Sequence, residues 1–435
     1  MKKIALINHG CAKNLVDSEL MLGILAKDGY KITLDDTKAD VVIINTCSFI
    51  HDAEEESVRS ILEMVEDGKK VIITGCLPQK HKKELKKAIP EAVAFLGTAD
   101  FKDISKVVGK LLSKDEDMVF DVSENPTYYY PEDVERQQIT VGASSYLKIA
   151  DGCNFECGYC IIPKLRGKYV SRSIENIVKE AKSLAKKGVN EIVLIAQDTT
   201  SYGIDLYGKT MLPALLEELN QIEELSWIRI MYTYPSMISD ELLHAMAKLD
   251  KVVNYVDIPL QHASRNVLKS MKRPQDDYRQ LIEKMRKIVP DIAIRTTFIV
   301  GYPGETQEDF EELCSFVEDV KFDKLGVFEF SKEKGTYAYS LPEQILSRVK
   351  KQRKNKLMKI QQKISLSVNE SMVGKKVNCI IESIDEQGMA VARTYKDAPE
   401  VDGLLYITTE EMLTPGDVVE VLVTSANEYD LFGTF

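Results

Sequence analysis

Six of the eight cysteines fall into two groups of three whose spacing could bind metal. One group is compact, with the spacing C-x3-C-x2-C, and the other is dispersed; they are Cys153, Cys157 and Cys160, and Cys11, Cys47 and Cys76. A cubane iron-sulfur cluster takes four ligands, so three thiolates leave one iron open to a molecule that reacts. A structural zinc site has four protein ligands and no open position. Each group therefore indicates a reactive cluster.

The compact group lies on a loop after a predicted strand, YLKIADG. Zinc sites usually draw on paired C-x2-C units with a fourth Cys or His, and no His lies within this segment. A loop of this length can wrap a cubane whose open iron faces the mouth of a barrel, where barrel enzymes keep their active sites.

The dispersed cysteines each follow a continuous apolar run: IALIN (4–8), VVIIN (41–45) and VIITG (71–75). Such runs are typical of parallel strands with helices on both sheet faces. The carboxyl ends of parallel strands share one edge, where open α/β sheets bind ligands. Three independent buried cysteines are the alternative, but recurrence at the same point of three successive units favours one site.

The elements around these cysteines predict three domains. We expect an open parallel α/β sheet at 1–125, a linker at 126–138, a TIM-like (β/α) barrel at 139–371, and a small antiparallel β-barrel of the oligonucleotide-binding type at 372–435. The central strands are predicted at 191–196, 227–232, 252–258, 292–300 and 324–330, with a helix at 174–187 capped by Ser173. A long basic helix is predicted at 342–368, at the end of the barrel domain.

Composition and charge limit the compartment and the partners. The 435 residues are 44% hydrophobic and 29% charged, with no apolar run near the roughly 20 residues that span a bilayer and no signal-peptide pattern. We therefore expect a cytoplasmic protein and no membrane partner, in a reducing compartment where clustered cysteines bind metal.

The net charge of −11 argues weakly against nucleic acid as the main partner. Residues 342–370 carry a balance of +6 and residues 371–435 a balance of −8. An acidic terminal domain repels RNA and attracts a basic protein, although a solvated surface explains either run equally well.

The compact spacing, with Tyr159 before its last cysteine, resembles the radical S-adenosylmethionine (SAM) superfamily. The resemblance implies that the open iron binds SAM and that the reduced cluster cleaves it to a 5'-deoxyadenosyl radical. The segment TTFIVGYPGET (296–306) also matches, and its Gly301 and Gly304 would let the backbone approach SAM closely.

The motifs GCAKN, NTCSF and TGCLPQ around the dispersed cysteines, followed by a five-stranded terminal domain, resemble the methylthiotransferases over essentially the whole chain. The resemblance implies that Cys11, Cys47 and Cys76 hold a second 4Fe-4S cluster, which presents methylated sulfur, and that a terminal TRAM domain grips the substrate. GCAKNLVDSE (10–19) and ARTYKDAPEVDGLLYI (392–407) resemble the branch that acts on ribosomal protein S twelve. The implied reaction adds a methylthio group to the β-carbon of an aspartate and needs a cellular electron donor. Modification of adenosine in transfer RNA and a non-catalytic iron-sulfur carrier are the alternatives.

Further candidates lie at or near the predicted strand ends. Gln197, Asp198, Gln261 and Arg295 are candidates to contact SAM or substrate, although structural hydrogen bonding is equally compatible with each; the planar fork of Arg295 suits a carboxylate. His9 is expected beside the dispersed site rather than as a ligand. Cys314 and Cys379 are expected in the core.

Overall fold

The structure is a computed structural model that describes residues 2–113, 119–139 and 142–435. The chain divides into two compact units. The first comprises Met1–Val141, Ala150–Glu156 and Cys160–Val170, and the second comprises Gly142–Ile149, Cys157–Tyr159 and Ser171–Phe435.

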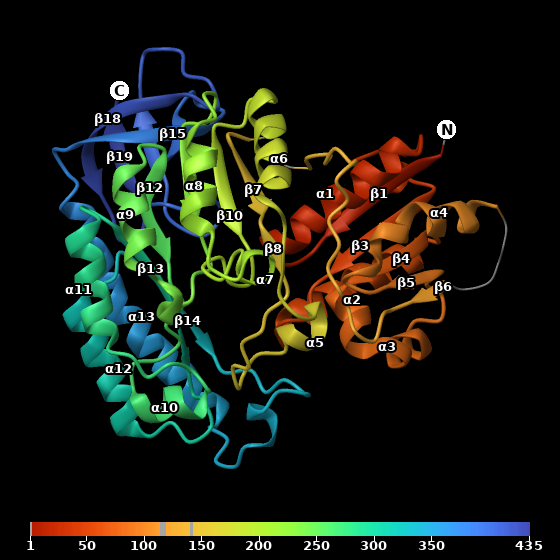
Figure 1. Ribbon diagram of the computed structural model, residues 1–435, viewed down its shortest axis with the longest axis horizontal. Helices are drawn as coiled ribbons and strands as arrows, with labels where there is room; N and C mark the ends of the chain where they lie inside the picture. Colours follow the sequence, from red (N-terminus) through yellow and green to blue (C-terminus); the bar gives the residue numbers. More distant parts are fainter. Residues whose placement is uncertain (1, 114–118, 140–141) are drawn as a thin grey trace. The chain divides into compact units, whose positions relative to one another are not determined.

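The first unit contains a parallel sheet with helices packed against it (Figure 1). In chain order its elements are β1 (Lys3–Asn8), α1 (Ala12–Lys27), β2 (Lys31–Ile32), β3 (Val41–Thr46), α2 (His51–Glu66), β4 (Lys70–Gly75), α3 (Cys76–Ala88), β5 (Ala94–Leu96), α4 (Ile104–Leu112), β6 (Val119–Asp121), β8 (Ala150–Asp151) and α5 (Ile162–Arg166).

The strand order in this unit is β2-β1-β3-β4-β5-β6, and every neighbouring pair runs parallel. All of β3 is buried, as its continuous apolar run predicts. The order reverses at β1, so the carboxyl ends of β1 and β3 flank a topological switch point, where sheets of this kind bind ligands.

The segment predicted as a linker, residues 126–138, packs against α1. The Arg136 Nε atom lies 3.0 Å from Glu19 Oε2 in a buried ion pair, and a Cβ on Gly23 would lie 2.4 Å from the carbonyl oxygen of Glu135. Tight packing of backbone on backbone is why Gly23 has no side chain here.

The second unit contains a second parallel sheet, a long helix and a terminal barrel. In chain order its elements are β7 (Ser144–Lys148), α6 (Ile174–Lys186), β10 (Glu191–Ile195), α7 (Ile204–Tyr207), α8 (Leu212–Asn220), β11 (Trp227–Ile230), α9 (Asp240–Lys248), β12 (Val252–Asp257), α10 (Arg265–Ser270), α11 (Tyr278–Ile288), β13 (Ala293–Val300), α12 (Gln307–Val320), β14 (Lys324–Glu329), α13 (Ser347–Glu370), β15 (Lys376–Ile384), β16 (Ala390–Thr394), β17 (Leu405–Thr408), β18 (Val418–Ala426) and β19 (Leu431–Thr434), and a short strand, β9 (Val170–Ser171), spans the boundary between the units.

The sheet order β14-β13-β12-β11-β10-β7 is sequential, as in a (β/α) barrel. Within the described residues no pairing joins β7 to β14, so this is a six-stranded partial barrel. Ser173 caps α6 through its hydroxyl, which accepts from the Asn176 N–H, as predicted. The terminal strands close into a barrel of order β15-β16-β17-β19-β18 with one parallel pair, β17 with β19.

The basic helix α13 begins at Ser347, later than the predicted residue 342. Residues 338–340 form a 3-10 turn and Leu346 is extended, with ψ of 141°, so the chain turns before the helix starts. The proline at position 342 also disfavours a helical conformation for the residue before it, so the helix does not begin there.

A buried charge network attaches the terminal barrel to the central sheet. Glu191 on β10 pairs with Arg229 at 2.6 Å and with Arg393 of β16 at 2.5 Å, and all three side chains are buried.

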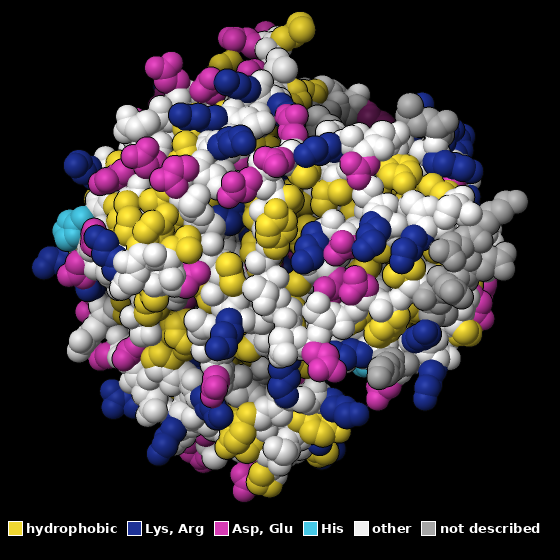
Figure 2. All heavy atoms as spheres, turned by 45° about the vertical axis from the view of Figure 1, so that its right-hand side comes forward, with side chains coloured by type: hydrophobic (Ala, Val, Ile, Leu, Met, Phe, Trp, Pro, Cys, Tyr) yellow, Lys and Arg dark blue, Asp and Glu magenta, His cyan; other side chains and the backbone are white. Residues whose placement is uncertain are grey.

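On the face shown in Figure 2, basic and acidic side chains are interspersed, so neither sign of charge dominates that face. No helix in the described ranges is both long and apolar enough to cross a bilayer.

Candidate functional site

The three dispersed cysteines lie at the carboxyl ends of strands that are neighbours in the sheet. Cys11 follows β1 and is the N-cap of α1, Cys47 directly follows β3, and Cys76 follows β4 and begins α3. Because β1, β3 and β4 are adjacent, the fold brings the three thiols to one edge at the switch point. The partial positive charge of a helix N-terminus favours a thiolate at two of them.

Glycine backbone allows this close approach. Gly10 has φ of +98°, and a Cβ there would lie 2.8 Å from Cys47 Cβ and 3.1 Å from its Sγ. Gly75, which precedes Cys76, has φ of +94°, and its Cβ would lie 2.7 Å from the carbonyl oxygen of Thr46. Both positions therefore require glycine.

The polar groups behind the thiols are paired with one another. Asn45 donates to the carbonyl oxygen of Asn14 and to Ser18 Oγ, both at 2.9 Å. Asn14 in turn donates to the carbonyl oxygens of His9 and Thr46. Paired buried amides fix the loop that carries Cys11 against the ends of β1 and β3.

The pKa values of the three thiols are shifted by burial, by one another and by nearby cations. Burial, together with the charges of Cys11 and Cys47, raises the pKa of Cys76 to about 12 against the opposing charge of Arg166. Burial also raises the pKa of Cys47. Cys11 is accessible at the surface, although surrounding atoms still desolvate its thiol; Lys13, Arg166 and nearby backbone N–H groups outweigh that burial and lower its pKa.

This donor set fits an iron-sulfur cluster better than a single ion. No three His, Cys, Asp or Glu side chains in the described ranges are placed to bind one metal ion. A cubane is larger, and each thiolate binds a different iron, so its ligands are gathered without converging on one point. Soft thiolates without carboxylates select such clusters. His9 lies beside the site, with Nδ1 3.6 Å from Glu56 Oε1.

The compact cysteines lie on the loop between β8 and α5, and the chain passes from one unit to the other within this loop. Cys153 and Cys160 belong to the first unit and Cys157 to the second. In the first unit, Gly152 has φ of +77° and a Cβ there would lie 2.1 Å from the carbonyl oxygen of Lys168, while the Cys153 N–H donates to Gly167. These contacts fix the start of the loop.

In the second unit, Cys157 and its neighbours pack on residues near the ends of the central strands. Arg273 Nη1 lies 3.9 Å from Cys157 Sγ, and the guanidinium stacks over the Tyr234 ring at 4.2 Å. Tyr159 packs against an apolar cluster that includes Met271 and Tyr302. Arg273 was not indicated by the sequence, since no spacing relates it to Cys157.

Four of the predicted SAM contacts lie just beyond strands of the central sheet. They follow β10, β12 and β13: Gln197, Gln261, Gly301 and Gly304. Both amide atoms of Gln197 are buried without a hydrogen-bond partner in the described structure, so the side chain is free to bind a ligand. Gln261, Gly301 and Gly304 have φ of +72°, +74° and +81°, and the N–H group of each is hydrogen-bonded within the protein. Next to Gln197, the Asp198 carboxylate accepts hydrogen bonds from the hydroxyls of Thr200 and Ser201, and burial raises the pKa of Asp198.

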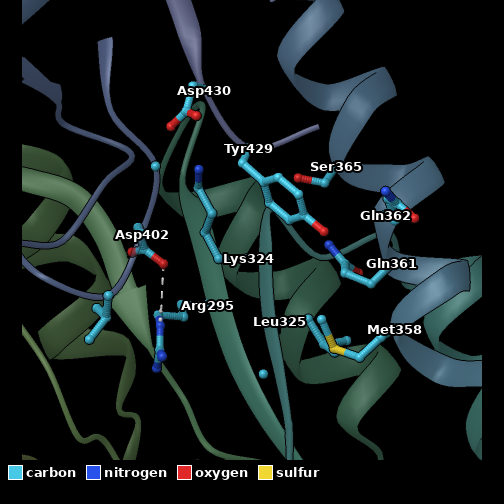
Figure 3. Close-up of a pocket in the computed structure, with 13 residues that line it drawn as sticks. Arg295, Lys324, Leu325, Met358, Gln361, Gln362, Ser365, Asp402, Tyr429 and Asp430 are labelled. Carbon is cyan, nitrogen blue, oxygen red and sulfur yellow. Dashed lines mark ion pairs between the residues drawn. The ribbon is translucent and has the colours of Figure 1, made fainter. Parts of the chain in front are cut away.

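Arg295 lies elsewhere. It is the third residue of β13, and its guanidinium pairs with Asp257 at 2.9 Å and with Asp402 of the terminal barrel at 3.4 Å. Figure 3 shows it at the wall of a cavity of about 270 Å³ between β14, α13 and the terminal barrel, with Lys324, Gln361 and Tyr429 on the other sides. Cys314 and Cys379 are buried in α12 and β15, as predicted.

Family models match three parts of the chain. They are the Radical SAM superfamily at residues 147–317, Uncharacterized protein family UPF0004 at residues 3–97, and the TRAM domain at residues 373–435. Two solved structures share the fold at low identity. TsrM from Kitasatospora setae, a radical S-adenosylmethionine methyltransferase, has a TM-score of 0.56 and 14% identity over 75% of this chain and 73% of that chain. OxsB, a cobalamin-dependent S-adenosylmethionine radical enzyme, has a TM-score of 0.52 and 13% identity over 83% of this chain and 56% of that chain.

Curated relatives match from end to end. The ribosomal protein uS12 methylthiotransferase RimO of Lachnoclostridium phytofermentans is 47% identical over 447 residues, which cover 99% of each chain. The same enzyme of Caldanaerobacter subterraneus is 47% identical over 441 residues and covers all of both chains. The chain therefore belongs to the RimO family of radical SAM methylthiotransferases, whose cofactors are 4Fe-4S clusters and SAM.

Proposed function

We propose that this chain adds a methylthio group to the β-carbon of an aspartate in ribosomal protein uS12. The observation that carries the proposal is the gathering of Cys11, Cys47 and Cys76 at the switch point of one sheet, in a chain that has a compact cysteine loop as well. Two sites of three thiolates each suit a reaction that needs both a radical and a sulfur donor. Full-length relatives named for this activity support it.

The two groups of cysteines would hold different clusters. Cys153, Cys157 and Cys160 would hold the cluster that binds SAM, and the dispersed cysteines would hold the auxiliary cluster. Bound in this way, the first cluster with SAM supplies radical chemistry able to break an unactivated C–H bond, and the second supplies sulfur. Acid-base side chains alone would not suffice, because such a carbon has neither a useful acidity nor a leaving group.

The protein's own residues orient and enclose these groups. The unpartnered amide of Gln197 would bind a polar part of SAM, with Gln261, Gly301 and Gly304 beyond the ends of other strands of the same sheet. The buried guanidinium of Arg273 near Cys157 Sγ would compensate thiolate charge. Arg295 is better suited to holding the terminal barrel, because Asp257 and Asp402 already occupy its fork.

The acidic terminal barrel would dock the basic substrate protein. Residues 371–435 contain four basic and twelve acidic residues. Several of the acidic side chains are exposed, among them Asp385, Glu386, Glu410, Glu411 and Glu420. Negative charge on a rim steers a cationic partner and repels RNA. The enzyme would act in the cytoplasm, with electrons from a cellular donor.

The test is anaerobic reconstitution followed by turnover of purified uS12. The wild type should bind about eight irons, form 5'-deoxyadenosine with SAM and dithionite, and add a methylthio mass increment to uS12. A variant with Cys11, Cys47 and Cys76 all changed to Ala should bind about four irons and add no methylthio group. Retention of all the iron would refute the assignment of the dispersed cysteines.

The two alternatives give different results in the same assay. A transfer-RNA enzyme would methylthiolate adenosine and leave uS12 unchanged. A non-catalytic carrier would bind iron but form no 5'-deoxyadenosine.

A further inference from the structure

Arg166 is a buried cation beside the dispersed cysteines. It is the last residue of α5, its side chain is 4% exposed, and its Nη1 lies 2.9 Å from Asp17 Oδ2 and 2.7 Å from Asp151 Oδ2. Nη2 donates to Asn14 Oδ1 at 2.5 Å. A guanidinium in this setting stays protonated, so its charge is fixed.

The same side chain reaches the thiols. Leu165 and Ile161 of the same segment form an apolar cluster with Cys76, and α5 lies beside α3, which begins at Cys76 (Figure 1). Nη2 reaches Asn14, whose backbone N–H donates to the carbonyl oxygen of Cys11, and the charge of the guanidinium acts to lower the pKa of all three thiols. The charge of Arg166 therefore favours the thiolate form of all three dispersed cysteines.

Arg166 also closes the base of the compact cysteine loop. Asp151 lies two residues before Cys153, and Arg166 lies six residues after Cys160, so the ion pair between Asp151 and Arg166 joins the two ends of the segment that carries these cysteines. Asp151 is held in turn, since its Oδ1 accepts from the Gly152 N–H at 2.8 Å.

We propose that Arg166 is a positioning residue that sets the reduction potential of the auxiliary cluster through its buried charge. The inference rests on the proposed function, because it takes the dispersed cysteines as cluster ligands. Cluster potentials depend on nearby charge and on hydrogen bonds to sulfur. Loss of a nearby cation stabilises the oxidised cluster, which carries less negative charge than the reduced one, and lowers the potential. Arg166 would thus keep this cluster at a higher potential than three thiolates alone would give.

The chain provides a matched control. Arg136 is equally buried in the same unit and pairs at 3.0 Å with Glu19, which lies on α1 like Asp17, but unlike Arg166 it is not one of the main charges that shift the pKa values of the three thiols. Loss of Arg136 therefore removes a buried cation that pairs with α1, as loss of Arg166 does, but it leaves the cluster site unchanged.

The experiment uses full-length protein in which Cys153, Cys157 and Cys160 are changed to Ala, so that only the auxiliary cluster assembles. Arg166→Gln, Arg166→Lys and Arg136→Gln are introduced into it, and iron content and an EPR-monitored redox titration are recorded for each. We expect about four irons in the parent and in Arg136→Gln, with equal midpoint potentials. Arg166→Gln should titrate at a more negative potential, and Arg166→Lys, which retains the charge but not the fork, should lie between them.

The outcomes separate the inference from the function beneath it. A parent protein that assembles no cluster would overturn the assignment of the dispersed cysteines, whatever Arg166 does. Potentials of both Arg166 variants equal to that of Arg136→Gln would overturn the role of Arg166 alone. If Arg166→Gln fails to fold, Arg166→Lys still decides, because a purely structural role predicts the parent potential for it.

Discussion

Gly10 shows how a single residue controls the dispersed site. Its φ of +98° and the 2.8 Å approach to Cys47 Cβ leave no space for a side chain. We expect Gly10→Ala to displace Cys47 and to lower the iron content from about eight to about four per chain, because only the auxiliary cluster loses a ligand. Gly68→Ala is the control, since Gly68 also has a positive φ, +69°, but nothing lies within 4 Å. Equal iron loss in both variants would attribute the effect to backbone strain instead of to contact with Cys47.

Gln197 gives a second test at the residue scale. Its buried amide has no partner in the described structure, so replacement by Leu removes a desolvated polar group at no cost in hydrogen bonds. We expect Gln197→Leu to leave the free energy of unfolding equal or higher and to weaken SAM binding by about tenfold, in line with about 1–3 kcal/mol for a buried hydrogen bond. Calorimetry with SAM and urea unfolding measure the two quantities. Unchanged SAM affinity would show that Gln197 does not bind the cofactor.

At the scale of elements, the strands that lead to cysteines could be predicted because each is a continuous apolar run. The short strands β5 and β6 could not, since three residues carry no periodicity. The side-chain partners could not be predicted from the sequence either. Arg166 binds Asn14 and Asp17, which lie about 150 positions away in the chain, and no spacing rule connects them. The sequence therefore predicts which strand ends share an edge, but not which cations stabilise them.

The pairing of α2 with α3 holds the helices that follow Cys47 and begin at Cys76. Glu54 on α2 accepts a hydrogen bond from Lys80 Nζ at 2.8 Å and lies in ion-pair contact with the His81 ring, and both partners are on α3. Burial alone would raise the pKa of Glu54, but these partners lower it to about 2. Because the folded-state pKa lies below the unfolded value of about 4.3, the stabilisation is complete above that value and is lost as pH falls towards 2.

We therefore expect Glu54→Gln to destabilise the protein by about 1–3 kcal/mol at pH 6 and by less at pH 3. Urea unfolding midpoints of wild type and variant at the two pH values measure the difference. Glu55→Gln, at the exposed neighbouring position, should change the free energy of unfolding by less than about 0.5 kcal/mol. A Glu54→Gln difference that grows as the pH falls would contradict the assignment.

At the scale of the whole molecule, the attachment of the terminal barrel depends on Glu191. Its partners Arg229 and Arg393 lower its pKa to about 2 against the effect of burial. Glu191→Gln leaves two buried guanidinium groups undercompensated, so we expect a loss of about 3–5 kcal/mol. Glu420→Gln, which breaks the exposed pair with Lys376, should cost about 0–1 kcal/mol. Thermal unfolding of both variants measures this, and similar small losses would mean that apolar contacts alone hold the barrel.

The charge of the terminal barrel leads to a prediction about substrate choice. Glu410 and Glu411 are exposed on the connection between β17 and β18, and no ion pair to either side chain is found in the described structure. We expect the double change to Gln to weaken binding of uS12 by about threefold to tenfold, mainly by slowing association, and the wild-type affinity to fall as salt rises.

Glu217→Gln with Glu218→Gln removes the same charge from an exposed stretch of α8 and should leave uS12 binding unchanged. Association rates at two salt concentrations distinguish local docking from a general effect of net charge. If the substrate were RNA, removing Glu410 and Glu411 would instead strengthen binding, because the lost carboxylates would no longer repel phosphates. The sign of one change in affinity thus decides which macromolecule this acidic surface is built to meet.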